Sequence, residues 1–232
     1  MALKAVLFDL DGTLIDFKID YTLARDKTIS VLENNGYPEG RLNHGMLVLE
    51  MVAIAIRYFE SQLGYSQKKI GEIKGEVSKA VEKVELLAAR KATPHPGIIN
   101  VLDFLTKNQI AMGILTFNTT QNAKVSIESA NLQDYFPYPD LYVGRDIVNN
   151  PKPHPDHVNV LLDRLGVSAQ DSVLIGDHPR DIESANNVNM RSVALVSRHH
   201  TPDSFDSDNV IFARDMSEKL VPILKKMMNG KR

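Results

Sequence analysis

Short apolar runs alternate with amphipathic segments along most of the chain. Four runs are nearly continuous, as is typical of parallel strands covered on both faces: Lys4–Leu10, Ile110–Thr116, Ser172–Gly176 and Arg191–Val196. Segments of helical periodicity lie between and after them, at Pro96–Leu105, Thr120–Ala130, Pro155–Leu165, Asp181–Asn187 and Met216–Met228. This alternation predicts an α/β fold, with a doubly wound parallel sheet and helices on both faces.

The stretch from about Asp16 to Arg90 contains no convincing strand and is expected to be helical throughout. Near its end, apolar residues recur at steps of three or four and predict one buried helix face: Ile70, Ile73, Val77, Val81, Val84 and Leu87. Tyr37-Pro38-Glu39-Gly40 predicts a turn between the first two helices. We therefore predict a core of residues 1–15 and 92–232, interrupted by a helical insert at 16–91.

Composition narrows the class of protein. With 43% hydrophobic residues and a formal net charge of −2, the composition does not indicate a nucleic-acid partner. It has no cysteine, which excludes disulfides and thiolate chemistry. The most hydrophobic stretch, Met46–Phe59, is interrupted by charges and falls short of the roughly 18 apolar residues of a membrane span. We expect a cytoplasmic protein without a membrane partner, either monomer or homodimer.

Two carboxylates follow the first predicted strand, in Asp9-Leu10-Asp11-Gly12-Thr13. The glycine allows a sharp turn, so one carboxylate can attack a substrate while the other lies beside the leaving group. An acidic strand end exposed to water is the alternative interpretation. Ligands bind beyond the carboxyl ends of strands in a doubly wound sheet, so this position is a candidate active site.

Two further segments offer groups for an anion. Thr116-Phe117-Asn118-Thr119 follows the second predicted strand and precedes a helix, so its hydroxyl and backbone N–H groups suit phosphate oxygens. Asn118 and Thr119 are equally ordinary N-cap residues. Lys152 lies in the loop Asn150-Pro151-Lys152-Pro153-His154-Pro155, where prolines restrain the backbone.

The fourth segment, Gly176-Asp177-His178-Pro179-Arg180-Asp181, again joins a strand to a helix. Asp177 and Asp181 can face the same space and offer the oxygen ligands that Mg²⁺ prefers. Each segment alone has an ordinary structural explanation. All four occur in order at strand ends of one predicted sheet, and this combination favours a common site.

These four segments resemble the motifs of haloacid dehalogenase-like hydrolases: Asp9-x-Asp11-Gly12-Thr13, Thr116, Lys152 and Gly176-Asp177-x-x-x-Asp181. The helical insert is similar to the small cap of the subgroup that includes phosphoglycolate phosphatases. The stretch from Val143-Gly144-Arg145-Asp146 through Lys152-Pro153-His154-Pro155 is close to members of that subgroup. The resemblance covers nearly the whole chain and identifies the family more sharply than the substrate.

The resemblance implies a Mg²⁺-dependent phosphatase for a small phosphorylated metabolite, such as phosphoglycolate or a sugar phosphate. Asp9 would be the nucleophile, Asp11 the acid and base, and Lys152 and Thr116 their catalytic partners. Gly12, Thr13, Phe117, Asn118 and Lys152 would bind the phosphate. Asp9, Asp11 (through its backbone carbonyl), Asp177 and Asp181 would hold Mg²⁺.

Two other activities and a non-catalytic role compete with this interpretation. A dehalogenase of the same fold is disfavoured because it does not need the second acid, Asp11. A phosphomutase of the β-phosphoglucomutase type uses the same motifs, and a binding protein of this fold would lack turnover. Substrate choice is expected to depend on the insert, where Lys18, Arg25 and Arg57 are candidates for a second anionic group. His154, His157 and His178 are not expected to bind metal.

Overall fold

The computed structural model describes residues 2–197 and 200–230. It divides into two compact units, one of residues up to Phe17 and from Ala89 onward, and one of Lys18–Ala88. We call the first the core unit and the second the helical unit. These boundaries lie within three residues of the predicted ones. Within the described ranges, no helix is long and apolar enough to cross a membrane.

The core unit contains a six-stranded sheet in the order β5-β4-β1-β6-β7-β8, with every neighbouring pair parallel. Its strands are β1 (Ala5–Phe8), β4 (Ala111–Leu115), β5 (Tyr142–Val143), β6 (Ser172–Gly176), β7 (Arg191–Val196) and β8 (Val210–Phe212). The predicted doubly wound α/β fold is confirmed. The sequence pattern missed the two shortest strands, β5 and β8.

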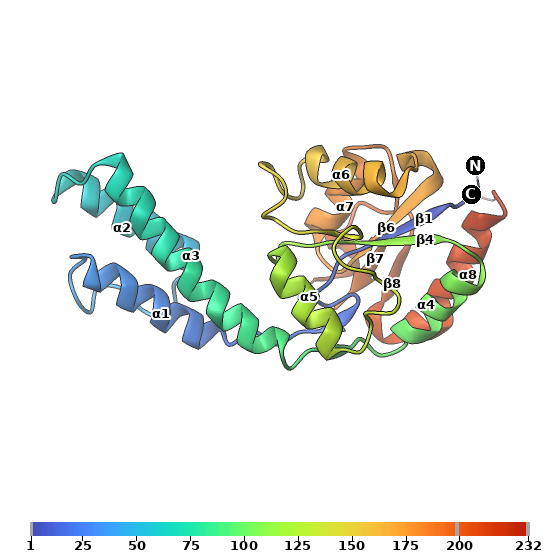
Figure 1. Cartoon of the computed structure of the whole chain (residues 1–232), viewed down its shortest axis with the longest axis horizontal. Coiled ribbons are helices and arrows are strands. Elements are labelled where there is room, and N and C mark those ends of the chain that lie inside the picture. Colours follow the sequence, from blue (N-terminus) through green and yellow to red (C-terminus); the bar gives the residue numbers. More distant parts are fainter. Residues whose placement is uncertain (1, 198–199, 231–232) are drawn as a thin grey trace. The chain divides into compact units, whose positions relative to one another are not determined.

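Helices cover both faces of the sheet (Figure 1). They are α4 (Ile98–Lys107), α5 (Thr120–Ser129), α6 (Pro155–Leu165), α7 (Pro179–Asn186) and α8 (Met216–Met228). Successive side chains of β1 point to opposite faces. Val6 and Phe8 join the apolar cluster with α4, α5 and α8, whereas Ala5 and Leu7 join the cluster with α6 and α7. β1 is therefore buried on both faces, which explains its continuous apolar sequence.

A separate two-stranded antiparallel pair joins β2 (Ile15–Asp16) to β3 (Thr93–Pro94). The prediction of helix from Asp16 onward was therefore wrong at its first residue, which belongs to β2. The pair brings together the two points where the chain leaves and re-enters the core unit.

The helical unit contains α1 (Tyr21–Asn34) and α2 (Val48–Ser61), and α3 (Gln67–Ala89) runs to its boundary. An apolar cluster holds it together, with Phe59 packed against Tyr37 and stacked on Tyr65 at a centroid distance of 5.4 Å. The predicted face of α3 is buried at Ile70, Ile73, Val77 and Val84. The prediction that Leu87 belongs to this buried face is wrong. Leu87 is 51% exposed, and the neighbouring Ala88 and Ala89 are buried instead.

Candidate active site

The first, second and fourth segments follow three neighbouring strands at the centre of the sheet. Asp9 follows β1, Thr116 follows β4, and Asp177 follows β6. Because β4, β1 and β6 are adjacent and parallel, their carboxyl ends lie along one edge. This edge is where ligands bind in doubly wound sheets.

Lys152 connects these strand ends from its loop between β5 and α6. The residue is 4% exposed. Its Nζ donates to Asp9 Oδ1 at 2.7 Å, to Asp181 Oδ1 at 2.6 Å and to the Leu115 carbonyl oxygen at 3.0 Å. An ammonium group has three donors, so these contacts use its full capacity. The third segment thus meets the first and the fourth in a buried, fully hydrogen-bonded arrangement.

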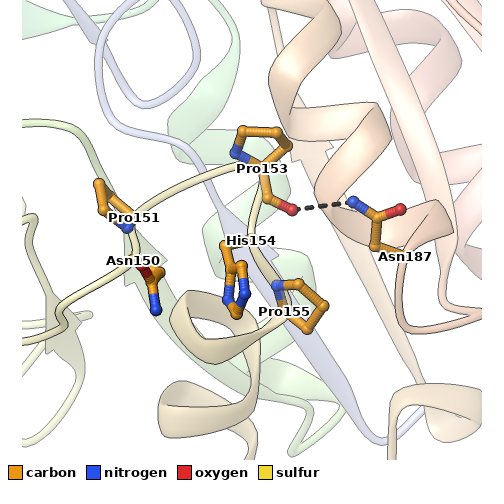
Figure 2. Close-up of a pocket in the computed structure, with 6 residues that line it drawn as sticks. All are labelled: Asn150, Pro151, Pro153, His154, Pro155 and Asn187. Carbon is orange, nitrogen blue, oxygen red and sulfur yellow. Dashed lines mark hydrogen bonds between the residues drawn. The ribbon is translucent and has the colours of Figure 1, made fainter.

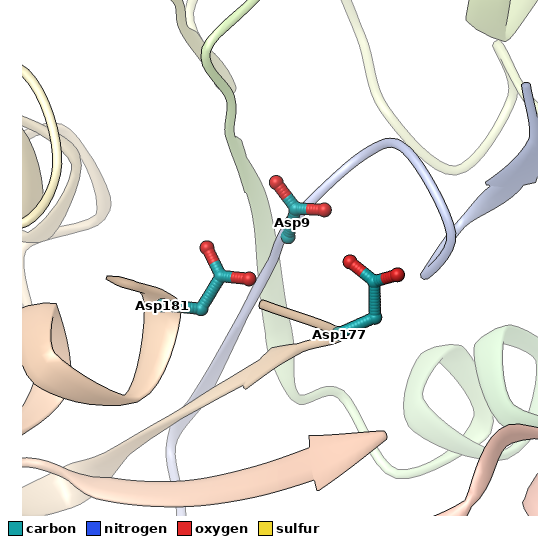
Figure 3. Close-up of side chains that lie close together, drawn as sticks. All are labelled: Asp9, Asp177 and Asp181. Atoms are coloured by element: carbon teal, nitrogen blue, oxygen red, sulfur yellow. The ribbon is translucent and has the colours of Figure 1, made fainter. Parts of the chain in front are cut away.

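Three carboxylates lie close together (Figure 3), and two of them accept from Lys152. Asp9, Asp177 and Asp181 each present one oxygen, and these oxygens lie within 4.8 Å of one another. The second oxygen of Asp181 accepts the backbone N–H of His178 at 3.0 Å, which fixes its orientation. Carboxylate oxygens are hard ligands suited to Mg²⁺ or another hard divalent cation.

Two glycines make room for this cluster. Gly12 has φ of +77°, and a Cβ at this position would overlap the Asp177 carboxylate. A Cβ on Gly176 would overlap the side chain of Asp181. Any larger residue would displace one of the carboxylates, so both glycines are required by the geometry of the cluster.

Asp11 lies outside this three-carboxylate cluster and contacts the second segment. The Asn118 side-chain amide donates to Asp11 Oδ2 at 2.7 Å, and the Asn118 backbone N–H donates to Thr116 Oγ1 at 3.0 Å. Thr119, not Asn118, is the N-cap of α5 and accepts from the backbone of Asn122. Asn118 therefore does not cap α5, and its side chain lies against Asp11 instead.

The electrostatics of the site are dominated by carboxyl groups. Burial is the largest cause that raises the pKa of Asp9 well above its ordinary value; Lys152 opposes this, and Asp181, Asp177 and Asp11 add to it. Burial would lower the pKa of Lys152, but the Asp181 and Asp9 carboxylates outweigh burial and raise it. Lys152 is therefore a permanent cation, and one ammonium faces an excess of negative charge that a metal ion would offset.

The remaining predicted phosphate ligands are Thr13, in the turn after β1, and Phe117, in the turn after β4. Thr13 is fully buried, and among the described residues its hydroxyl has no hydrogen-bond partner. The Phe117 ring lies 5.6 Å from Lys152 Nζ and 5.5 Å from Arg180 Cζ. Its carbonyl oxygen accepts Arg145 at 2.6 Å. Arg145 and Arg180 were not predicted, because isolated arginines carry no signal in a single sequence.

The three basic candidates of the insert belong to the helical unit. Lys18 and Arg57 are exposed. Arg25 Nε donates to the Met46 carbonyl oxygen at 3.0 Å, so part of its guanidinium already has a structural role.

The three histidines have structural contacts. His154 and His178 are N-caps of α6 and α7, where each ring accepts a backbone N–H. His157 is fully buried and contacts the backbone of Lys152 at 3.0 Å. No sequence pattern connects His157 with the site, because an ordinary core histidine has the same pattern.

A pocket of about 360 Å³ lies beside the Lys152 loop (Figure 2). It is lined by Asn150, Pro151, Pro153, His154, Pro155 and Asn187. The Asn187 side-chain amide donates to the Pro153 carbonyl oxygen at 3.0 Å. Asp9, Asp177 and Asp181 do not line this pocket. The bond from Asn187 across it holds the Lys152 loop against α7.

Comparison with known proteins agrees with the geometry. The family model described as haloacid dehalogenase-like hydrolase matches residues 6–195. "Probable phosphatase IndB" of Dickeya dadantii is 27% identical over 85% of this chain and 83% of its own length. The phosphoglycolate phosphatase of Escherichia coli is 26% identical over 88% of this chain and 85% of its own.

A solved structure shares the fold. The crystal structure of a haloacid dehalogenase-like hydrolase of family IA, variant 3, from Entamoeba histolytica has a TM-score of 0.68 at 20% identity, covering 96% of this chain and 100% of that one. The family match spans most of the chain and includes most of the first strand and the loops that carry the four segments. The chain therefore belongs to the family of haloacid dehalogenase-like hydrolases.

Proposed function

We propose that this hydrolase is a Mg²⁺-dependent phosphatase that transfers the phosphoryl group of a small metabolite to Asp9 and then to water. The observation that carries the proposal is the meeting of Lys152 with Asp9 and Asp181 at the carboxyl edge of the sheet. The names of the curated relatives, a phosphatase and a phosphoglycolate phosphatase, support this class of reaction.

The donor set fits a hard divalent cation. Three carboxylate oxygens converge, and their charge exceeds that of Lys152. We assign Asp9, Asp177, Asp181 and the backbone carbonyl of Asp11 as the groups that would hold Mg²⁺. When bound, the ion would neutralise the crowded anions and polarise the phosphoryl group. Mg²⁺ is proposed in preference to softer metals because these ligands are oxygen atoms.

The nucleophile is Asp9. One of its carboxylate oxygens bonds to phosphorus while the bond from phosphorus to the substrate oxygen breaks, giving an aspartyl-phosphate and an alkoxide. Lys152 Nζ, fixed between Asp9 and Asp181, holds the attacking carboxylate and contributes positive charge where the phosphoryl oxygens lie. Thr116, Thr13 and the N–H groups of the two turns bind the remaining phosphoryl oxygens.

Asp11 moves the protons. It donates one to the departing alkoxide and then accepts one from the water that attacks phosphorus, which releases Asp9 as a carboxylate. The amide of Asn118 donates to Asp11 Oδ2 at 2.7 Å and so orients this carboxyl group. Both half-reactions thus use one anchored phosphoryl group and one acid–base residue.

Residues 16–91 would serve as a cap that excludes water and selects the substrate. Lys18, Arg25 and Arg57 are the candidates for binding a second anionic group of the substrate; the Lys18 and Arg57 side chains are exposed, and Arg25 also donates to the Met46 carbonyl oxygen. A carboxylate, as in phosphoglycolate, or a second phosphate meets this requirement. A cytoplasmic location and a monomeric or dimeric state remain predictions.

The test is release of inorganic phosphate from a panel of phosphorylated metabolites, with Mg²⁺ and with a chelator. We expect saturable hydrolysis that disappears on chelation and returns when Mg²⁺ is added. Accumulation of an isomerised sugar phosphate would instead identify a phosphomutase. Saturable binding without turnover of any compound would identify a binding protein and refute the proposal.

A further inference from the structure

His157 connects two parts of the site without belonging to it. It lies in the first turn of α6 and is 0% exposed. Its Nδ1 accepts the backbone N–H of Lys152 at 3.0 Å. Its Nε2 contacts the Val143 carbonyl oxygen of β5 at 2.9 Å. Both ring nitrogens are therefore engaged with backbone groups.

These partners determine the tautomer of the ring. A backbone N–H only donates, so Nδ1 must carry a lone pair. A carbonyl oxygen only accepts, so Nε2 must carry the proton. Burial lowers the pKa of His157 to about 4, which keeps the ring in this neutral form near neutral pH. A protonated ring could not accept from Lys152.

The Val143 carbonyl oxygen has a second partner. It also accepts the backbone N–H of Thr116 at 3.1 Å. A carbonyl oxygen has two lone pairs, so both bonds are accommodated. One chain of hydrogen bonds therefore runs from Thr116 through Val143 and His157 to Lys152, and joins the backbones of two predicted catalytic residues.

A second contact holds the loop on the other side of Lys152. Asn187, the C-cap of α7, donates to the Pro153 carbonyl oxygen (Figure 2). Pro153 contributes no backbone donor of its own. The backbone of the lysine loop is thus fixed at Lys152 by His157 and at the next residue by Asn187. Of these two contacts, only that of His157 extends to the end of β4.

We propose that His157 is a positioning residue for Lys152: its Nδ1 holds the Lys152 backbone N–H, and the bond from its Nε2 to the Val143 carbonyl oxygen keeps the ring in the tautomer that can accept. The inference rests on the proposed function, since it assumes that the placement of Lys152 Nζ matters for phosphoryl transfer. Misplacing a reacting group by about 1 Å can cost roughly 100-fold in rate. The contact joins the His157 side chain to backbone groups of the same unit, so it needs no metal and no substrate to form.

Two substitutions separate positioning from packing. In His157→Asn the amide oxygen is as many bonds from Cβ as Nδ1, so it can still accept from Lys152, whereas the bond to Val143 is lost. In His157→Gln the amide nitrogen matches Nε2, so the bond to Val143 survives and the bond to Lys152 is lost. Both replace the ring with a smaller amide, and a packing role alone would impair them alike.

We expect His157→Gln to lower kcat roughly 100-fold with a much smaller change in KM, because the ground-state contacts to phosphate remain. His157→Asn should be at least about tenfold faster than His157→Gln. His154→Asn, in an exposed residue of the same loop, is the control and should retain wild-type kcat. Equal losses in the two His157 variants, or wild-type kcat in His157→Gln, would overturn the inference.

A measurement on the wild-type protein covers the case in which the variants do not fold. Nitrogen-15 NMR of labelled histidine should show the His157 proton on Nε2 and none on Nδ1. A proton on Nδ1 would refute the contact, whatever the activity. If the wild-type protein hydrolyses no phosphomonoester, the proposed function fails, and this spectrum still decides whether His157 holds Lys152.

Discussion

The two units of the chain bury different kinds of side chain. The core unit buries Asp9, Lys152, Asp181, Thr116 and Asn118 at the carboxyl edge of its sheet. Among the described residues of the helical unit, the only buried polar residue is Thr28, whose hydroxyl donates to the Ala24 carbonyl oxygen within the same helix. The rest of its interior is apolar.

This difference indicates that the core unit carries the reaction, whereas the interior of the helical unit serves packing. Burying a charge is costly unless it is paired and hydrogen-bonded, so a buried group of charges indicates a requirement other than stability. The helical unit shows no such concentration and can be stabilised by apolar contacts alone. Substitutions of the buried charged and polar residues in the core unit should therefore change the reaction, whereas substitutions in the apolar interior of the helical unit should change the stability of that unit.

The largest expected effect is on the nucleophile. Asp9→Asn keeps the size and an acceptor for Lys152 but removes the charged oxygen that attacks phosphorus, so kcat should fall roughly 1,000-fold or more. Steady-state hydrolysis of a phosphomonoester with Mg²⁺ measures it. Asp163→Asn, on the exposed surface of α6, is the matched control. Activity of Asp9→Asn within about tenfold of wild type would remove Asp9 from this role.

The second effect shows what the charge pairing contributes. Lys152→Met leaves Asp9 and Asp181 buried without their cation, and breaking a buried pair in this way costs about 3–5 kcal/mol. We expect both hydrolysis and the free energy of unfolding to fall, measured by assay and by urea denaturation in the absence of metal. An unchanged unfolding midpoint would contradict a stabilising role for Lys152 in the metal-free protein.

The third effect concerns the helical unit. Phe59→Ala removes a buried ring that packs against Tyr37 and Tyr65, at a cost of about 3–5 kcal/mol. Hydrogen exchange should accelerate in α1 and α2 and remain slow in β1, β4 and β6. Leu49→Ala, at a residue that is 82% exposed, should change little. Equal acceleration in both units would show that their stabilities are not separable.

The fourth effect is a pH dependence from His157. The pKa of His157 is about 4 in the folded protein, whereas an unperturbed histidine, as in the unfolded chain, has a pKa of 6.5. Between these two pH values the unfolded chain therefore binds more protons than the folded protein. The contribution of neutral His157 to the free energy of unfolding is fully present above pH 6.5. It is lost as the pH falls toward 4, by up to about 3 kcal/mol. Urea midpoints across this range should decline more steeply in wild type than in His157→Asn. Parallel declines would contradict a buried neutral His157.

The sequence predicted those parts of the fold in which local pattern and tertiary environment agree. β1, β4, β6 and β7 are largely buried on both faces, so their sequences are nearly continuously apolar. β5 has two residues and β8 has three, too few to establish a period. Leu87 has the correct helical spacing but is exposed. Spacing identifies one face of a helix, but it does not show how far along the helix other elements pack against that face.

The candidate site was predicted as a set of positions but not as a network. The spacing of Asp9 and Asp11 and of Asp177 and Asp181 is local, and a single sequence shows it. The bond from Asn118 to Asp11 spans 107 residues, and the bond from Lys152 to Asp9 spans 143. His157 carries no local signal, because its function depends on two backbone groups that only the fold brings together.

The central claim is that Asp9 carries the phosphoryl group between the two half-reactions. Borohydride reduces an acyl phosphate to an alcohol, so trapping during turnover with Mg²⁺ should convert Asp9 to homoserine, detected by mass spectrometry of the peptide that contains it. The account predicts this conversion only when substrate is present. Conversion of a different aspartate, or an unmodified Asp9 while phosphate is released, would contradict it.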